Sequence, residues 1–162
     1  MKRRGHSSPD PRDAILIVDL QAGFKPPTSL VKQIEKYSLT FRRRIFTKFI
    51  NPPGSMFRQQ LDYHALAPGT AETQLLIRPT ISDLVFKKAS YGLRAHHVIK
   101  LKSLNLREIV VCGVDTDACV LAALFSIFDA GIRARVKPEF CWSSGGLHRM
   151  ALKVIRRQFG PI

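Results

Sequence analysis

The sequence predicts an α/β fold: a three-layer αβα, Rossmann-like arrangement around a mainly parallel sheet of five or six strands. Short apolar segments of strand length alternate with segments whose apolar residues recur at helical spacing. The first apolar segment is hydrophobic almost throughout, as in parallel strands that are covered on both faces. With 162 residues, 45% of them hydrophobic, the chain is long enough for one sizeable core and too short for two.

In the first half of the chain, the predicted elements are a strand, a helix, a second strand and a loop, at residues 14–20, 29–39, 44–50 and 51–55. The two strands are short apolar segments (AILIVDL and RIFTKFI). The helix is indicated by Leu30, Ile34 and Tyr37, which recur at helical spacing. The prolines and the glycine of NPPGS indicate the loop.

In the second half, helices alternate with strands, the predicted helices at residues 69–79, 95–105, 117–131 and 147–159 and the predicted strands at 83–88, 108–113 and 132–138. Thr70 is a possible cap of the first of these helices, and Pro79 stands beyond its end. Gly131 suits the position that follows the last turn of a helix. The final helix is amphipathic and closes the chain.

The chain divides into a flexible basic tail, residues 1–13, and a single domain, residues 14–162. The tail lacks the apolar segment of a signal peptide, and no apolar run approaches the ~20 residues that a membrane span needs. The three cysteines, Cys112, Cys119 and Cys141, are odd in number and show no CxxC spacing. This disfavours a disulfide framework and a zinc knuckle, so we expect a cytoplasmic protein with free thiols.

The formal charge is +14, from 26 basic and 12 acidic residues, which indicates either an acidic partner or a solvated basic surface. The basic residues form short clusters at residues 2–4, 42–44 and 156–157. No recognisable nucleic-acid module surrounds these clusters, so nucleic acid ranks below a small-molecule substrate as the expected partner. A basic surface would steer an anionic substrate toward the protein.

Three strands are followed by, or end in, residues that can carry out chemistry: Asp19, Lys88 and Cys119. Parallel α/β sheets bind ligands at the carboxyl ends of their strands, which would gather these side chains. A thiol nucleophile reacts as the thiolate, which a nearby cation and a helix N-terminus both favour. With Thr116 as the N-cap, Cys119 lies in the first turn of its helix. Lys88 would then supply the cation, and Asp19 would carry the proton.

Each of these residues also has a structural interpretation. An aspartate after a strand often forms an Asx turn, a lysine in a KK pair is usually solvated, and a cysteine in an apolar segment usually packs in the core. We interpret Cys112 and Cys141 as cysteines that pack in the core. It is the coincidence of the three residues at predicted strand ends that favours chemistry.

Five segments, ILIVDLQAGF, IFTKFINPPGSMF, LVFKKASYG, VVCGVDTDACVLAALFSIFDAG and CWSSGGLHRMALKVIRRQFG, together resemble the isochorismatase-like cysteine hydrolase family, which includes nicotinamidases and related small-amide hydrolases. They span almost everything after residue 13, in the family's order. The GVDTDACV element, with the aspartate and lysine segments at matching places, is the most specific part of the resemblance.

The resemblance implies a triad of Asp19 as proton shuttle, Lys88 as electrostatic support and Cys119 as nucleophile. Tyr91, three residues after Lys88, selects this lysine rather than its neighbour as the counterpart of the family's lysine. The resemblance also implies a cis peptide bond between Val114 and Asp115, with the amides of Asp115 and Cys119 forming an oxyanion hole. The implied reaction is attack on a carbonyl, a thioester intermediate and hydrolysis by water.

The sequence departs from the family's pattern in three places. Metal-binding members carry an Asp-x-His element and a further histidine after the second strand, and residues 47–64 lack this pattern, with His64 read as a loop residue. We therefore expect no catalytic metal and no cofactor. Asp115 stands where the family often has a small apolar residue, so its carboxylate either faces solvent or shapes the substrate pocket. The chain ends at Ile162, where many relatives add a strand, so a sheet edge could face a neighbouring subunit.

The residues expected to line a substrate pocket lie near the three strand ends: Phe24, Phe49, Asn51, Tyr91, Thr116 and Trp142. The leading hypothesis is a metal-independent cysteine hydrolase of a small amide or a related C–N bond, assembled by resemblance as a homodimer or homotetramer. A second hypothesis is a catalytically idle family member that acts as a binding or assembly module. A third is a basic nucleic-acid-binding protein.

Overall fold

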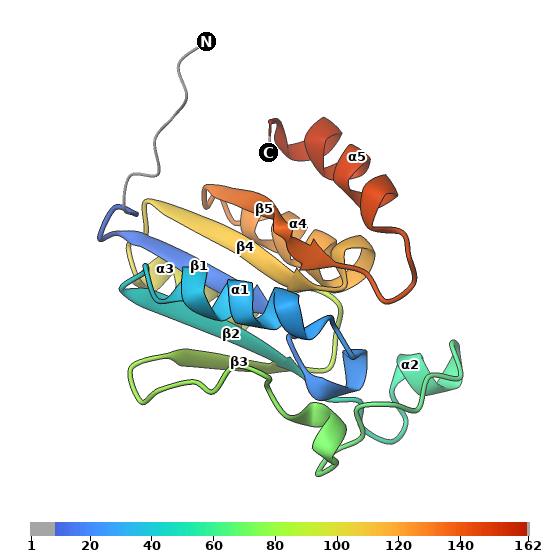
Figure 1. Cartoon of the computed structure of the whole chain (residues 1–162). Coiled ribbons are helices and arrows are strands. Elements are labelled where there is room, and N and C mark those ends of the chain that lie inside the picture. Colours follow the sequence, from blue (N-terminus) through green and yellow to red (C-terminus); the bar gives the residue numbers. More distant parts are fainter. Residues whose placement is uncertain (1–8, 162) are drawn as a thin grey trace.

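A computed structural model describes residues 9–161 and contains one five-stranded sheet in which all neighbouring strands are parallel (Figure 1). The strands are β1 (Asp13–Val18), β2 (Arg43–Phe49), β3 (Leu84–Lys88), β4 (Glu108–Val114) and β5 (Ala134–Trp142), in the spatial order β3-β2-β1-β4-β5. The chain builds one half of the sheet outward from β1 and then returns to build the other half. The carboxyl ends of β1 and β4 therefore form a topological switch point, the usual place for a ligand in such sheets.

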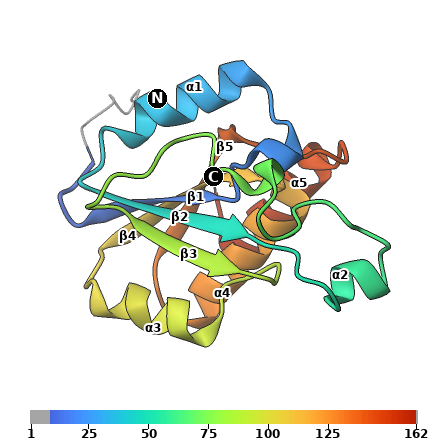
Figure 2. The ribbon, with the colours of Figure 1, turned by 90° about the horizontal axis from the view of Figure 1, so that it is seen from below.

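The principal helices are α1 (Thr28–Ser38), α3 (Ala95–Ser103), α4 (Leu121–Asp129) and α5 (His148–Phe159). Helix α1 lies on one face of the sheet, and α3 and α4 lie on the other, which confirms the predicted three-layer arrangement (Figures 1 and 2). Helix α5 follows β5, and its Phe159 packs against Phe125 and Phe128 of α4, with ring centroids 5.0 and 5.5 Å apart. No helix among residues 9–161 is long and apolar enough to cross a membrane.

Strand β1 is the centre of the core. Residues 14–18 are fully buried, because β2 and β4 flank the strand and helices cover both faces of the sheet. Burial of each of its large aliphatic side chains stabilises the fold by ~1.5–3 kcal/mol. The near-continuous hydrophobicity of this segment is thus explained by a parallel strand with no solvent-facing side.

The predicted tail overlaps the domain by one residue. Residues 1–8 lie outside the part of the chain that the structure describes. Asp13, assigned to the tail from the sequence, is instead the first residue of β1 and is buried. Its carboxylate accepts two hydrogen bonds from Arg107, at 2.8 and 2.5 Å, which compensates for the burial of its charge.

The predicted helix at residues 69–79 is wrong apart from a single 3₁₀ turn, Ala71–Thr73. The segment that follows pairs its backbone with the chain after β1: the Ala22 N–H donates to the Gln74 carbonyl and the Leu76 N–H donates to the Leu20 carbonyl. These hydrogen bonds replace the internal ladder that a helix would need. The only α-helical turn of the long β2–β3 connection is α2 (Met56–Gln59).

Strand β5 is longer than predicted, because it continues past an irregularity. Val111 of β4 pairs with Val136, but Gly113, only two residues further on, pairs with Cys141, five residues further along β5. Pro138 lies in the extra stretch and has no N–H to donate to the sheet, which accounts for the bulge. The bulge carries the end of β5 toward the carboxyl edge of the sheet.

Candidate active site

Asp19 follows directly after β1 and is completely buried. Its φ of 45° lies in the left-handed region, which is uncommon for a residue other than glycine. The Asp19 N–H donates to Thr47 Oγ1 at 3.0 Å, and the Thr47 hydroxyl donates to Asp19 Oδ1 at 2.6 Å. Because Thr47 belongs to the adjacent strand β2, the sheet itself fixes both the backbone and the carboxylate of Asp19.

Lys88, the last residue of β3, reaches across the end of β2 to the same carboxylate. Its Nζ lies 2.6 Å from Asp19 Oδ2, and both side chains are fully buried. The ammonium also donates to the carbonyls of Ser90 and Tyr91 at 2.8 and 3.0 Å, and it lies 5.4 Å from the centre of the Phe49 ring. Three oxygen atoms therefore hold the ammonium in one position.

Cys119 lies in a π-helical turn, Thr116–Val120, that joins β4 to α4. The N-cap of this turn is Asp115 and not the predicted Thr116, because Thr116 is already the first residue of the turn. The turn arises because the Val120 N–H donates to the Asp115 carbonyl five residues back, at 2.9 Å. Turns of this kind often occur at functional sites.

The thiol of Cys119 interacts with both members of the ion pair. Burial, followed by the charge of Asp19, raises the pKa of the Cys119 thiol above its ordinary value, and Lys88 offsets only part of this increase. This direction favours the protonated thiol, whereas the sequence led us to expect that the lysine and the helix terminus favour a thiolate. Apart from its ion pair with Lys88, Asp19 Oδ2 has no hydrogen-bond partner within the part of the chain that the structure describes, which leaves it available to accept the thiol proton.

Gly113 allows the end of β4 to come close to β1. Its φ is +118°, and a Cβ atom added there would lie 2.2 Å from the carbonyl oxygen of Val18. Only glycine fits this approach, which brings the turn carrying Cys119 beside Asp19. The peptide bond between Val114 and Asp115, which follows directly, is cis. The resemblance implies a cis bond at this same position.

A cavity of about 270 Å³ opens beside Cys119. Half of its lining residues are aromatic, and the lining consists of Phe24, Phe49, Phe57, Leu61, Tyr63, Tyr91, Asp115, Ala118, Cys119 and Ser144. Three of the predicted pocket residues, Phe24, Phe49 and Tyr91, thus lie against the cavity that the thiol faces. Both residues predicted to supply oxyanion-hole amides, Asp115 and Cys119, line it as well.

The other three predicted pocket residues lie outside this lining. Asn51 is fully buried and its amide donates to the carbonyls of Tyr63 and Ala65, at 2.7 and 3.0 Å, so it holds the loop rather than a ligand. The Thr116 hydroxyl is also buried, hydrogen-bonded to His148 Nδ1 at 2.9 Å. Trp142 ends β5 and packs against the core.

Sequence reasoning missed one wall of the cavity, formed by the chain around α2. Phe57 and Leu61 are four residues apart, a spacing that signals a shared face, and Tyr63 follows them. Phe57 lies between two of the predicted aromatic residues: its ring centroid is 4.8 Å from that of Phe49 and 4.7 Å from that of Tyr91. The wall was missed because NPPGS indicated only an irregular loop.

The side chain of Asp115 is held against the loop that follows β5. Its Oδ1 accepts from the Ser144 N–H at 2.7 Å, and its Oδ2 accepts from the Ser144 hydroxyl at 2.9 Å. Burial raises the pKa of the Asp115 carboxyl, and the two hydrogen bonds from Ser144 oppose that increase. Of the two alternatives for this residue, a solvent-facing side chain or one that shapes the pocket, the structure places it in the cavity wall.

The described side chains do not fit a catalytic zinc ion, which needs three protein ligands from His, Cys, Asp or Glu. Within residues 9–161 these residue types form no cluster of three or more with metal-binding geometry. His64 instead pairs with Asp62, its Nε2 2.8 Å from Oδ1, and both side chains are exposed. No step of the reaction is therefore assigned to a metal.

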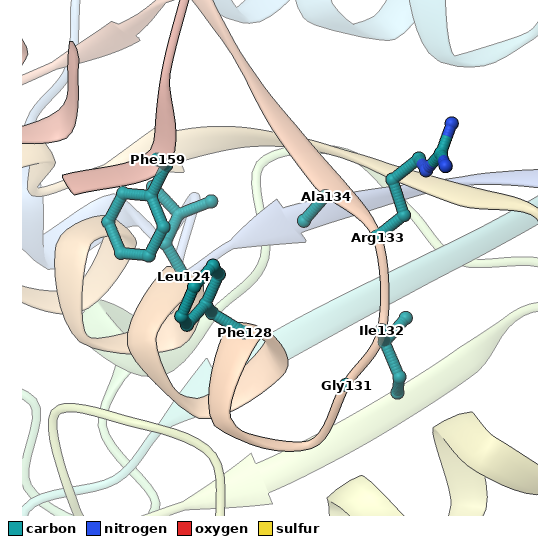
Figure 3. Close-up of a pocket in the computed structure, with 7 residues that line it drawn as sticks. All are labelled: Leu124, Phe128, Gly131, Ile132, Arg133, Ala134 and Phe159. Carbon is teal, nitrogen blue, oxygen red and sulfur yellow. The ribbon is translucent and has the colours of Figure 1, made fainter. Parts of the chain in front are cut away.

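A second cavity, of about 470 Å³, lies at the opposite end of the sheet, between α4, α5 and the segment that enters β5 (Figure 3). It is lined mainly by apolar residues, among them Leu124, Phe128 and Phe159. Among the described residues that line it, Arg133 is the only one with a titratable side chain, and Figure 3 shows it pointing away from the apolar residues. None of these lining residues is a nucleophile or a proton carrier, so the cavity beside Cys119 is the stronger candidate for an active site.

Comparisons with solved structures bear out the fold. The pyrazinamidase of Pyrococcus horikoshii in complex with zinc superposes with a TM-score of 0.83 at 16% identity, over 92% of this chain and 97% of that one. PnC1 from L. infantum in complex with nicotinate gives 0.78 at 19% identity, over 93% and 90% of the two chains. N-carbamoylsarcosine amidase from Thermoplasma acidophilum gives 0.77 at 18% identity, over 91% and 92%.

Sequence comparison identifies the family. "Isochorismatase domain-containing protein 2" of Xenopus laevis is 29% identical over 90 residues, 51% of this chain and 44% of that protein. Its Bos taurus counterpart is 32% identical over 56 residues, 35% of this chain and 28% of that protein. The match thus spans less than half the length of either relative. The family model of the isochorismatase domain matches residues 13–162, and the chain therefore belongs to the isochorismatase family.

Proposed function

We propose that this protein is a metal-independent cysteine hydrolase that cleaves a small amide or a related C–N bond through a thioester on Cys119. The observation that carries the proposal is the buried ion pair of Asp19 and Lys88, 2.6 Å apart, beside the only cysteine that lines the cavity. Burying two charges costs several kcal/mol per ion, which a pair of apolar side chains would avoid. Such a pair next to a thiol and a cavity is the arrangement expected of an active site.

In the first half of the proposed reaction, Asp19 Oδ2 takes the thiol proton as the sulfur attacks the carbonyl carbon. The C–N bond then breaks, and Asp19 delivers the proton to the leaving nitrogen. Lys88 balances the negative charge that moves between the carboxylate and the sulfur. The main-chain amides of Asp115 and Cys119 are assigned to the developing oxyanion.

In the second half, a water molecule attacks the thioester. Asp19 takes a proton from this water and returns it to the sulfur as the C–S bond breaks, which releases the carboxylic acid and restores the thiol. A single carboxylate fixed by Thr47 thus serves both half-reactions. The relatives named above as a pyrazinamidase and an N-carbamoylsarcosine amidase support amide hydrolysis as the reaction class.

The test is a panel of small primary amides, with release of ammonia measured for the wild-type protein and for Cys119→Ala. We expect turnover by the wild type and loss of at least about 10³-fold in the variant, because the substitution removes the thiol that forms the covalent intermediate. Cys141→Ala is the matched control, since Cys141 does not line the cavity. Turnover that survives in Cys119→Ala would refute the proposal, and an idle wild type would favour the binding-module hypothesis.

A further inference from the structure

The cavity beside Cys119 combines five aromatic side chains with a single charged one. The charged residue is Asp115, and among residues 9–161 no lysine or arginine lines the cavity. The ammonium of Lys88 is fully buried outside the lining and is matched by Asp19 at 2.6 Å. Although the chain carries a formal charge of +14, the charge that a ligand meets in this cavity is negative.

The carboxylate of Asp115 is held in place at the cavity wall. Ser144 donates to both of its oxygens, at 2.7 and 2.9 Å, so it cannot rotate away without losing two hydrogen bonds. Each oxygen keeps a lone pair for a further partner. Tyr63 lies within electrostatic reach: burial and then the charge of Asp115 raise the pKa of Tyr63 to about 12. The phenol therefore stays neutral and adds no second negative charge to the cavity.

Aromatic faces and a carboxylate attract the same kind of group. A cation over a desolvated aromatic ring gains up to ~2 kcal/mol, and a cation next to a carboxylate gains a charge-assisted interaction as well. An anionic group in the same place would face Asp115 with no cation to balance it. The long-range field of the basic surface is screened within ~8 Å at physiological ionic strength, so local contacts decide selectivity.

Resting on the proposed function, we propose that the preferred substrates are small amides whose acyl group carries a fixed positive charge, such as an ammonium or quaternary ammonium, and that Asp115 determines this preference. The volume of about 270 Å³ suits a compact cation only a few bonds from the scissile carbonyl. This substrate class is opposite in charge to the anionic one that the overall composition suggests.

The test measures equilibrium binding, so that it does not depend on turnover. Cys119→Ala is titrated calorimetrically at ~0.15 M salt with trimethylammonioacetamide and with 3,3-dimethylbutanamide, which have the same shape but differ by one positive charge. We expect the cationic amide to bind at least about tenfold more tightly. Adding Asp115→Asn to this variant should reduce the ratio of the two affinities to near one, and Asp115→Glu should retain most of it.

Asp117→Asn is the matched control, because it removes a neighbouring carboxylate that bonds to Ser143 and does not line the cavity. It should leave the ratio unchanged. Equal affinities, no binding of the cationic amide, or a ratio that survives Asp115→Asn in a variant with native circular dichroism would each overturn the inference.

Wild-type turnover then separates the two proposals. Hydrolysis of the neutral amide together with equal affinities would leave the proposed function standing and refute the charge preference. The expected affinity ratio with no hydrolysis of either amide would leave the charge preference standing and refute the proposed function.

Discussion

Cys119 depends for its chemistry on two buried neighbours that act on it in opposite directions. Asp19 raises the pKa of its thiol and Lys88 lowers it. A protonated thiol beside a carboxylate is coherent for a proton shuttle, because the proton moves only when a carbonyl is in place to be attacked. We therefore expect the nucleophilicity of the Cys119 thiol and the turnover rate to respond differently when one of these two neighbours is removed.

Asp19→Asn should lower the pKa of Cys119, since the raising charge is gone and Lys88 remains. Alkylation of Cys119 by a small neutral electrophile at pH 7 should then be faster than in the wild type. Turnover should nevertheless fall by about 10²-fold or more, because the proton carrier is lost. Lys88→Met should slow both processes. Rates come from mass-spectrometric mapping of the three cysteines; slower alkylation in Asp19→Asn would contradict the electrostatic argument.

Thr47 positions Asp19 without touching the cavity lining. Thr47→Val keeps the shape but leaves the Asp19 N–H and one carboxylate oxygen without this partner, which should lower the free energy of unfolding by ~1–3 kcal/mol. Urea denaturation measures the change. Thr40→Val, at an exposed position, is the control and should have little effect. An unchanged stability in Thr47→Val would show that water replaces the hydroxyl.

For individual residues, the sequence predicted which three side chains come together better than it predicted their surroundings. Asp19, Lys88 and Cys119 could be found because each stands at a predicted strand end, and parallel strands bring their ends together. Thr47 could not be found, since a threonine inside a strand gives no sign of a long-range partner. The wall that contains Phe57 and Tyr63 was missed because its position depends on tertiary packing of an irregular loop.

At the scale of elements, the sequence predicted the alternation of strands and helices but not the long β2–β3 connection. The segment at residues 69–79 has a possible helix cap at Thr70 and a proline at its end, yet its backbone pairs with residues 20–22, and no local pattern reports such pairing. The predicted strand at residues 132–138 stops at Pro138, but this proline lies inside β5 and interrupts the strand rather than ending it. Tertiary hydrogen bonds outweigh local preference in both places.

Gly113 gives a direct test of how β4 approaches β1. Gly113→Ala places a Cβ 2.2 Å from the Val18 carbonyl at a φ of +118°, so we expect a loss of at least ~3 kcal/mol in stability. Gly145→Ala is the matched control, because nothing lies within 4 Å of its added Cβ. Thermal unfolding followed by circular dichroism compares the two, and equal melting temperatures would argue against the close approach.

At the scale of the whole molecule, the buried thiols couple stability to alkaline pH. Burial raises the pKa of Cys112 and Cys119, and it raises the pKa of Cys141 to about 12, from an ordinary value of 9.0. Above pH ~9 the unfolded chain loses thiol protons that the folded chain keeps, so this contribution to stability is complete below pH 9 and is lost as the pH rises.

Urea unfolding under reducing conditions at pH 7.5 and pH 10 should show this decline. Cys112→Ala should be less stable at both values but should decline less steeply between them, since it removes one of the three titrating groups. If the stability of the variant falls as steeply between these two pH values as that of the wild type, groups other than Cys112 cause the decline. The self-association expected from the family resemblance remains a prediction at this scale.

Trapping the thioester intermediate tests the proposed reaction. The wild-type protein is mixed rapidly with an amide that it hydrolyses. The reaction is then quenched in acid and examined by intact and peptide mass spectrometry. We predict a mass increase equal to the acyl group, located on Cys119 and absent from Cys119→Ala. Steady turnover without any acyl adduct, or an adduct on Cys112 or Cys141, would contradict the account.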